Sequence, residues 1–82
     1  MIIKYPVSTE KSIRLMESEN KLIFVVDEKA TKPEIKKAIE EMFSVKVVDV
    51  KTHNDPKGRK KAYIRFSSET PAIDLATKLG LM

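Results

Sequence analysis

The sequence contains no cysteine and only two glycines among its 82 residues. Without cysteine the chain has no disulfide bond, no thiolate zinc ligand and no cysteine nucleophile. The isolated Gly58 and Gly80 cannot form the glycine-rich loop of a P-loop or of a dinucleotide-binding site. No apolar run approaches the roughly 18 residues of a transmembrane helix, and residues 1–6 lack the apolar stretch of a secretory signal. We therefore expect an intact cytoplasmic chain with no membrane insertion and no cofactor.

Side chains suited to catalysis or metal binding are also scarce. His53 is the only histidine, and a metal site needs several nitrogen, sulfur or carboxylate ligands. As a general base, His53 would need a nucleophile or an acid partner, and the sequence offers no such constellation. The sequence therefore predicts no catalytic residue, no metal site and no small-molecule substrate. A binding protein is favoured over an enzyme or a ligand-sensing domain.

The excess positive charge is concentrated in one segment of the chain. The net charge is +4, but residues 1–50 are neutral, with nine basic and nine acidic side chains. Residues 51–66 hold six basic side chains against the single acid Asp55. The six are Lys51, Lys57, Arg59, Lys60, Lys61 and Arg65. Such crowding favours a nucleic-acid partner, because each contacted phosphate relieves repulsion and releases counterions; a solvated basic loop is the alternative.

Capping residues and apolar spacing predict three helices. The first is capped by Ser8 or Thr9 and runs to about residue 18. The second opens with a capping box formed by Thr31 and Glu34 and ends near Phe43. Its expected buried face consists of Ile35, Ala38, Ile39, Met42 and Phe43. The third is capped by Thr70, with Pro71 at its first position, Ala72, Ile73, Ala76 and Leu79 on its apolar side, and Gly80 at its end.

Apolar runs and turn residues predict three strands, with a fourth possible at Ile2 and Ile3. Residues 22–26 are apolar on both parities, which indicates a central strand covered on both faces. Residues 45–52 and 60–67 form an antiparallel hairpin through a type I turn that begins at Asp55 and ends at Gly58. Residues 1–82 are thus one α+β domain. We expect a small sandwich, with a mostly antiparallel three- to four-stranded sheet and helices packed on its faces.

The strand period gathers cations on one face of this hairpin. Lys51 and His53 from the first arm share a face with Lys61, Tyr63 and Arg65 from the second. Ammonium and guanidinium groups contact phosphates, and the ring of Tyr63 can stack on an unpaired base. The alternative is that Tyr63 packs beneath the first or the last helix. The same parity places Val48, Val50 and Thr52 on the opposite face.

Three segments within residues 5–79 together match a known family. The first is Pro6-Val7-Ser8-Thr9-Glu10-Lys11-Ser12, followed by Phe24 and Val26. The second runs from Ala30 to Val45, with Lys32-Pro33-Glu34-Ile35-Lys36 and Ala38-Ile39-Glu40, and is followed by Val50-Lys51-Thr52. The third is Lys60-Lys61-Ala62-Tyr63-Ile64-Arg65-Phe66. The combination resembles the universal large-subunit ribosomal protein twenty-three family. The short link at residues 54–59 is similar to the archaeal-type short form, whereas bacterial-type members carry a long basic extension there. Lys51 and Phe66 stand where the family usually has Asn and Leu.

The resemblance implies a structural protein of the large ribosomal subunit in the cytoplasm. Its implied partners are large-subunit ribosomal RNA beside the polypeptide exit tunnel, neighbouring large-subunit proteins, and the signal recognition particle. Thr9 and Glu10 match the family's factor-docking positions. The expected rRNA-binding residues, from the charged face and the family match together, are Lys11, Lys32, Lys36, Lys51, Thr52, His53, Lys57, Arg59, Lys60, Lys61, Tyr63 and Arg65. A free-standing RNA-binding module outside the ribosome is the alternative.

Overall fold

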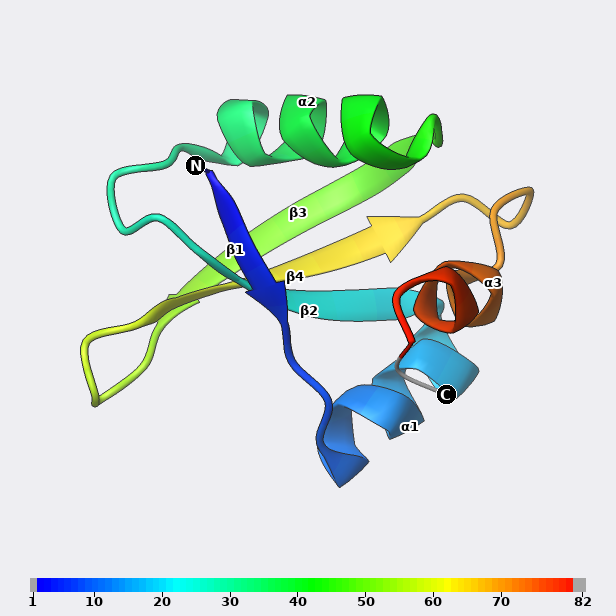
Figure 1. The fold of residues 1–82 in the computed structure, drawn as a ribbon, viewed down its shortest axis with the longest axis horizontal. Coiled ribbons are helices and arrows are strands. Elements are labelled where there is room, and N and C mark those ends of the chain that lie inside the picture. Colours follow the sequence, from blue (N-terminus) through cyan, green and yellow to red (C-terminus); the bar gives the residue numbers. More distant parts are fainter. Residues whose placement is uncertain (1, 81–82) are drawn as a thin grey trace.

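Three helices and four strands follow one another in the computed structural model, which describes residues 2–80. The elements are β1 (Ile3–Pro6), α1 (Glu10–Glu19), β2 (Lys21–Val26), α2 (Lys32–Phe43), β3 (Val47–Asn54), β4 (Lys60–Phe66) and α3 (Ala72–Lys78). The strands form one antiparallel sheet in the order β1-β2-β4-β3 (Figure 1). The predicted α+β architecture is confirmed, and the short N-terminal edge strand is present.

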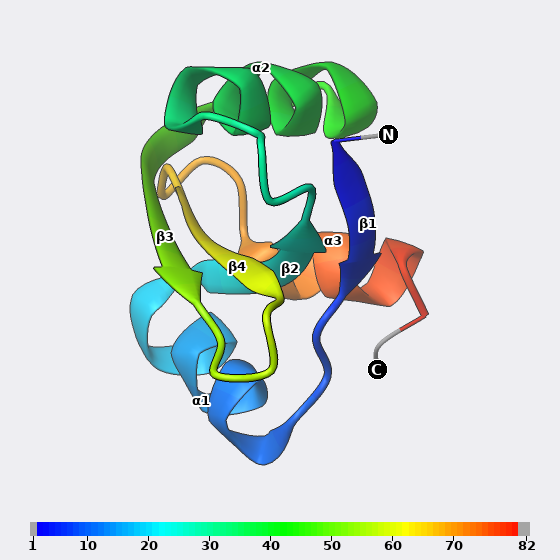
Figure 2. The same cartoon turned by 90° about the vertical axis from the view of Figure 1, so that its left-hand side faces the viewer.

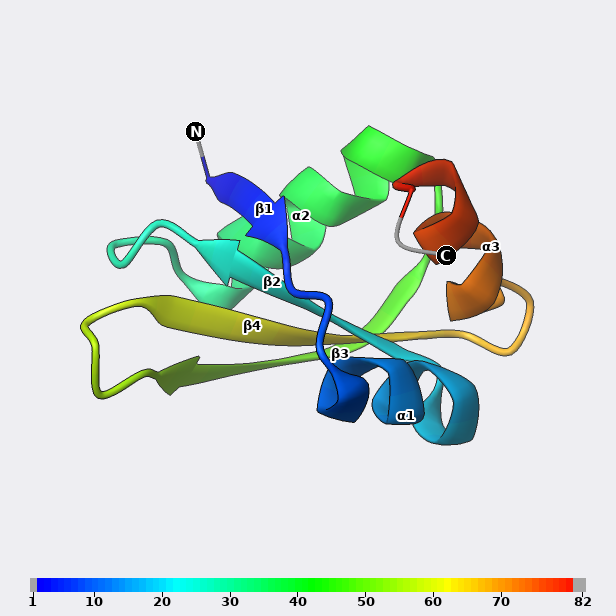
Figure 3. The same cartoon turned by 60° about the horizontal axis from the view of Figure 1, so that its bottom comes forward.

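Helices cover both faces of the sheet. α2 and α3 lie on one side and α1 lies on the other (Figure 3). On β2, alternate side chains such as Phe24 belong to the main core with Ile35 and Ile39 of α2, and Ile23 and Val25 are buried on the opposite face. The prediction of a central strand covered on both faces is confirmed. Within residues 2–80, no helix combines the length and the apolar character of a membrane span.

Two of the three helices begin with the capping residues that the sequence indicates. Thr9 caps α1, with its hydroxyl accepting from the Ser12 N–H at 3.2 Å and the Ser12 hydroxyl accepting from the Thr9 N–H at 2.8 Å. Thr31 and Glu34 form the expected reciprocal box at the start of α2. The predicted cap of the third helix is wrong: Pro71, which has no capping side chain, precedes α3 in place of Thr70.

The turn between β3 and β4 forms as predicted. The two strands run side by side into it, as Figure 2 shows. The N–H of Gly58 donates to the carbonyl of Asp55 at 2.9 Å, which closes the turn. Gly58 has a φ of 86°, a left-handed backbone conformation that glycine adopts more readily than other residues. The chain therefore reverses over five residues, 55–59, and this short turn sets the register of the hairpin.

Three apolar side chains predicted to face the core are exposed instead. Val48 is 55% exposed while Val47 is buried, because a register irregularity between Val47 and Asp49 shifts the strand alternation. Met42 is 53% exposed, and Phe43 makes the contact with the sheet in that turn, its ring centroid 6.3 Å from that of Phe24. On α3, Ile73 is exposed and Leu75 is buried in its place.

Asn20 joins three parts of the chain that are distant in sequence. It lies between α1 and β2 in the left-handed conformation, with a φ of 57°. Its side-chain amide nitrogen lies 3.0–3.1 Å from the carbonyls of Phe66, Ser67 and Thr70, so its two N–H hydrogens are shared among three acceptors. Its amide oxygen accepts from the N–H of Ala72 at 2.7 Å. Asn20 thus ties the start of β2 to the end of β4 and to α3.

Candidate nucleic-acid interface

The hairpin brings the predicted cations together on the face that α1 flanks. Lys51 of β3 pairs with Tyr63 of β4, and His53 pairs with Lys61. Residues opposite each other in an antiparallel pair point to the same side of the sheet, so these four side chains form one surface. Lys51 and His53 are exposed, and Lys61 and Tyr63 are half-buried. The predicted grouping of these residues is confirmed.

A groove of about 380 Å³ lies between this surface and α1. Its lining residues, which we call the basic groove, are Lys11, Lys21, Lys51, Thr52, His53 and Tyr63. None of these six side chains is acidic. The ammonium of Lys21 is 3.1 Å from the carboxylate of Glu19, an ion pair at the rim. The groove therefore offers three lysines and a histidine around a single phenol ring.

Lys21 is the member of the basic groove that the sequence analysis missed. A signal was present, because Lys21 shares its strand parity with Ile23 and Val25. Ile23 lies opposite Tyr63 in the β2–β4 ladder, so this parity points to the same face as the predicted cations. The predicted strand begins at residue 22, one residue too late to include Lys21.

The tip of the hairpin is held by one acidic side chain. The carboxylate of Asp55 lies 3.2 Å from the Lys61 ammonium and 3.5 Å from the Arg59 guanidinium. It also accepts from the Lys57 N–H at 2.8 Å. That backbone hydrogen bond, followed by the contact with Lys61, holds the pKa of Asp55 below its usual value. Asp55 thus neutralises part of the positive charge of residues 51–66, at Lys61 and Arg59.

Arg59 makes a second contact that anchors the tip to the far edge of the sheet. Its guanidinium donates to the hydroxyl of Tyr5 in β1 at 3.2 Å. The Tyr5 hydroxyl, together with Asp55, raises the pKa of Arg59. Lys57, at the centre of the turn, is exposed. The turn is therefore bound to the body of the protein by side chains, and it presents Lys57 outward.

The remaining predicted RNA contacts lie away from the basic groove. Lys60 has the opposite parity, and its ammonium donates to the carbonyl of Ala30 at 2.7 Å. Lys32 and Lys36 of α2 line a separate groove beside exposed Val48 on β3. Arg65 is exposed on β4, in register with Asp49. Apart from Lys60 and Arg65, the predicted set thus lies on the basic groove and the adjoining hairpin face, at the hairpin tip, and in the groove beside α2.

The two residues expected to meet a protein factor differ in their accessibility. The Thr9 side chain is engaged in capping α1. Glu10, the next residue, has a side chain that is 85% exposed and pairs with the equally solvent-exposed Arg14 at 3.2 Å. An exposed pair of this kind contributes little to stability, so Glu10 can exchange Arg14 for another partner at small cost.

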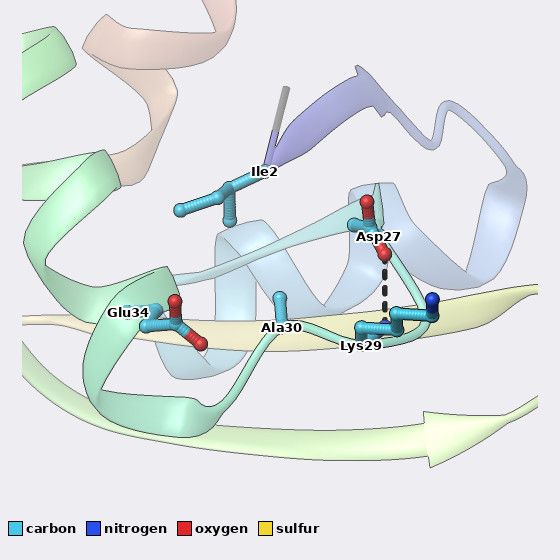
Figure 4. A pocket seen from close by; sticks show the side chains of 5 residues that line it. All are labelled: Ile2, Asp27, Lys29, Ala30 and Glu34. Atoms are coloured by element: carbon cyan, nitrogen blue, oxygen red, sulfur yellow. Dashed lines mark hydrogen bonds between the residues drawn. The ribbon is translucent and has the colours of Figure 1, made fainter.

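A smaller pocket of about 150 Å³ contains two carboxylates that could suggest catalysis. In Figure 4, Asp27 and Glu34 lie on either side of Ala30. Asp27 accepts from the Lys29 N–H at 2.9 Å, and Glu34 accepts from the Thr31 N–H at 2.9 Å. These backbone hydrogen bonds lower the pKa of each carboxyl. Both groups thus stay charged to stabilise a turn and a helix start. Among residues 2–80, no cluster of three or more potential metal ligands occurs.

Comparison with known proteins adds an independent observation. The family described as Ribosomal protein L23 matches residues 1–76. Large ribosomal subunit protein uL23 of Methanococcus aeolicus is 48% identical over 80 residues, which cover 98% of this chain and 93% of the relative. The uL23 protein of Methanococcus maripaludis strain C7 gives the same identity and coverage.

A more distant organism supplies a similar match. The uL23 protein of Trypanosoma brucei brucei is 49% identical over 81 residues, which cover 99% of this chain and 49% of that longer relative. The similarity therefore includes every helix and strand described above. The chain belongs to the ribosomal protein L23 family.

Proposed function

We propose that this protein binds large-subunit ribosomal RNA through the basic groove and the adjoining outer face of the β3–β4 hairpin. As a member of the ribosomal protein L23 family, it is a structural protein of the large ribosomal subunit, located in the ribosome in the cytoplasm. The observation that supports the RNA contact is the groove itself, which gathers Lys11, Lys21 and Lys51 with no acidic lining residue.

Electrostatics explain why this face binds RNA in preference to remaining solvated. Lysines held close together repel one another, and phosphates turn that repulsion into attraction while releasing condensed counterions. Lys57 at the hairpin tip and Arg65 on β4 extend the same charged face. Lys32 and Lys36 form a second contact on the α2 side of edge strand β3. We place Lys60 outside the main interface, because a backbone carbonyl already holds its ammonium.

The protein acts without catalysis in this proposal. Members of ribosomal protein families are in general structural. The described carboxylates with lowered pKa values, Asp27, Glu34 and Asp55, each accept a backbone hydrogen bond in a turn or a helix start. The helices and the sheet instead hold the basic face in a fixed shape for a polyanion.

The salt dependence of RNA binding tests this proposal. Filter binding of large-subunit ribosomal RNA should show affinity that falls steeply with salt. Lys51→Ala should lower the slope of log affinity against log salt by roughly 0.7–0.9, the value for one lost phosphate contact. Lys78→Ala, at an exposed lysine that ends α3 on the far side of the sheet, makes the same charge change and should leave the slope unchanged. No binding by the wild type, or equal slopes for both variants, would contradict the proposal.

A location beside the exit tunnel, among neighbouring large-subunit proteins, is the second part of the proposal. The start of α1 then helps form a docking site for nascent-chain factors such as the signal recognition particle. Glu10 supplies an exposed negative charge, and Thr9 fixes the first turn that presents it. Large subunits assembled with Glu10→Lys should bind the signal recognition particle at least about 10-fold more weakly, because like charges oppose each other across the contact. Glu17→Lys is the matched control on the same helix, and an equal loss there would contradict the role of Glu10.

The competing function is an RNA-binding module that acts outside the ribosome. It uses the same basic groove, so RNA binding alone does not distinguish it. Sedimentation does: the proposal expects the protein to migrate with large subunits after a high-salt wash. Recovery in light fractions alone would favour the free-standing module.

A further inference from the structure

The basic groove differs from an ordinary charged surface because an aromatic ring forms part of its wall. Tyr63 lies in the middle of the hairpin, paired with Ile23 of β2 on one side and Lys51 of β3 on the other. The residue is half-buried, yet it lines the groove. One part of its side chain is thus packed in the sheet, and another part faces the open space beneath α1.

The groove is an open hollow with the volume of a small-molecule site. Its volume of about 380 Å³ lies in the range of roughly 300–1,000 Å³ found for small-molecule sites. Its walls come from two elements, α1 with Lys11 and the sheet with Lys51 and His53. An RNA duplex hides the faces of its bases in the stack, so only a base turned out of the stack can reach the ring of Tyr63.

We propose that the basic groove receives one unpaired nucleotide of the bound RNA, with its base stacked on Tyr63. Lys11 and Lys51, from opposite walls, contact the phosphates on either side of that nucleotide. The inference rests on the proposed RNA binding and adds its form: a single-stranded position, such as a bulge or a loop, is required at this face. Stacking tolerates any base, so the groove selects for an unpaired nucleotide and not for a sequence.

An acidic peptide is the competing occupant, and the ring argues against it. Carboxylates would satisfy the lysines equally well, but they give Tyr63 no partner of matching shape. A nucleotide satisfies both parts of the groove at once, with its phosphates on the cations and its flat base on the ring.

The test uses two RNA probes that differ only in pairing. One is a short oligoadenylate with a central 2-aminopurine, and the other is the same strand annealed to its complement. The wild-type protein should bind the single strand more tightly and change the 2-aminopurine fluorescence, as stacking on an aromatic ring does. The annealed strand should bind more weakly and show no such change. Equal affinity for both probes, or no fluorescence change with the single strand, would overturn the proposal.

Substitutions at residue 63 separate stacking from charge. Tyr63→Leu should weaken single-strand binding by roughly 5- to 150-fold, the equivalent of about 1–3 kcal/mol for one lost stack. Tyr63→Phe keeps the ring and should retain both affinity and fluorescence change. Circular dichroism checks that each variant is folded, and the wild-type fluorescence result stands even if Tyr63→Leu does not fold. A folded Tyr63→Leu with wild-type affinity would overturn the proposal.

Two further measurements keep this inference distinct from the proposed function. If the wild type binds large-subunit ribosomal RNA but Tyr63→Leu binds it equally well, the nucleotide site is wrong and the RNA-binding role stands. If the wild type does not bind that RNA, the RNA-binding role itself is wrong. Competition by a polyglutamate peptide as effective as that by oligoadenylate would assign the groove to an acidic protein instead.

Discussion

Among the polar side chains of the described residues, that of Asn20 makes the most hydrogen bonds between distant parts of the chain. Four hydrogen bonds to three carbonyls and one N–H end at its amide group, which is partly buried. Asn20→Ala should lower the free energy of unfolding by about 2–4 kcal/mol, because several backbone groups lose their partner at once. Urea denaturation measures this. Asn20→Gly relieves the left-handed backbone but restores no hydrogen bond, so a glycine variant as stable as wild type would contradict the explanation.

The acidic side chain of the hairpin tip makes stability depend on pH. Because contacts lower the pKa of Asp55 in the folded state, this carboxylate stabilises the protein above its unfolded pKa of about 3.9, and the contribution is lost as the pH falls through the folded pKa. Asp55→Asn should therefore melt at a lower temperature than wild type at pH 6. The difference should shrink as the pH falls below about 3.9. A difference that persists unchanged at low pH would show that charge is not its source.

At the scale of the element, the irregularity in β3 is the clearest test of the structure. Val47 is 2% exposed and Val48 is 55% exposed, although simple alternation assigns them the opposite way. Val47→Ala should cost about 1.5–3 kcal/mol of unfolding free energy, whereas Val48→Ala should change it by less than about 0.5 kcal/mol. Chemical denaturation of the two variants gives both values. A larger loss at Val48 than at Val47 would mean that the strand alternates regularly.

The helices and the hairpin turn could be predicted from local sequence, and the irregularity in β3 could not. The capping box of Thr31 and Glu34 and the turn ending at Gly58 act within four residues, so their signals are complete in the sequence. The shift at Val47 depends on which residue of β4 lies opposite, and Val47 in fact pairs with Phe66. Local alternation contains no information on that partner. The same limit explains the exposed Met42, since Phe43 makes the contact with Phe24.

At the scale of the whole molecule, one part of the candidate site could likewise be predicted from local sequence and another part could not. Strand parity predicted that Lys51, His53, Lys61 and Tyr63 share a face, because a hairpin has a local register. The position of Lys11 across the groove depends on how α1 crosses the sheet, and the packing of distant elements determines that crossing. The two-walled groove therefore became visible only in the folded molecule.

RNA binding should stabilise the whole fold, because the groove joins α1 to the sheet. At a free RNA concentration 100-fold above the dissociation constant, a ligand that binds only the folded state adds about 2.7 kcal/mol to the unfolding free energy. Hydrogen exchange of the β2 and β4 amides that open only by global unfolding should then slow by about 100-fold with a large-subunit ribosomal RNA fragment. High salt should reverse the effect. Unchanged exchange in saturating RNA would mean that binding does not require the folded groove.

The strand order also determines when a newly made chain can fold during its own synthesis. β4 lies between β2 and β3, so neither earlier strand has its central neighbour until residue 66 has left the ribosome. The side-chain amide oxygen of Asn20 gains its partner, the N–H of Ala72, only after that later residue has emerged. In nascent chains shorter than this, the apolar run of β2 has β1 as a neighbour but lacks β4. Until its last helix emerges, each new copy therefore lacks part of its hydrophobic core.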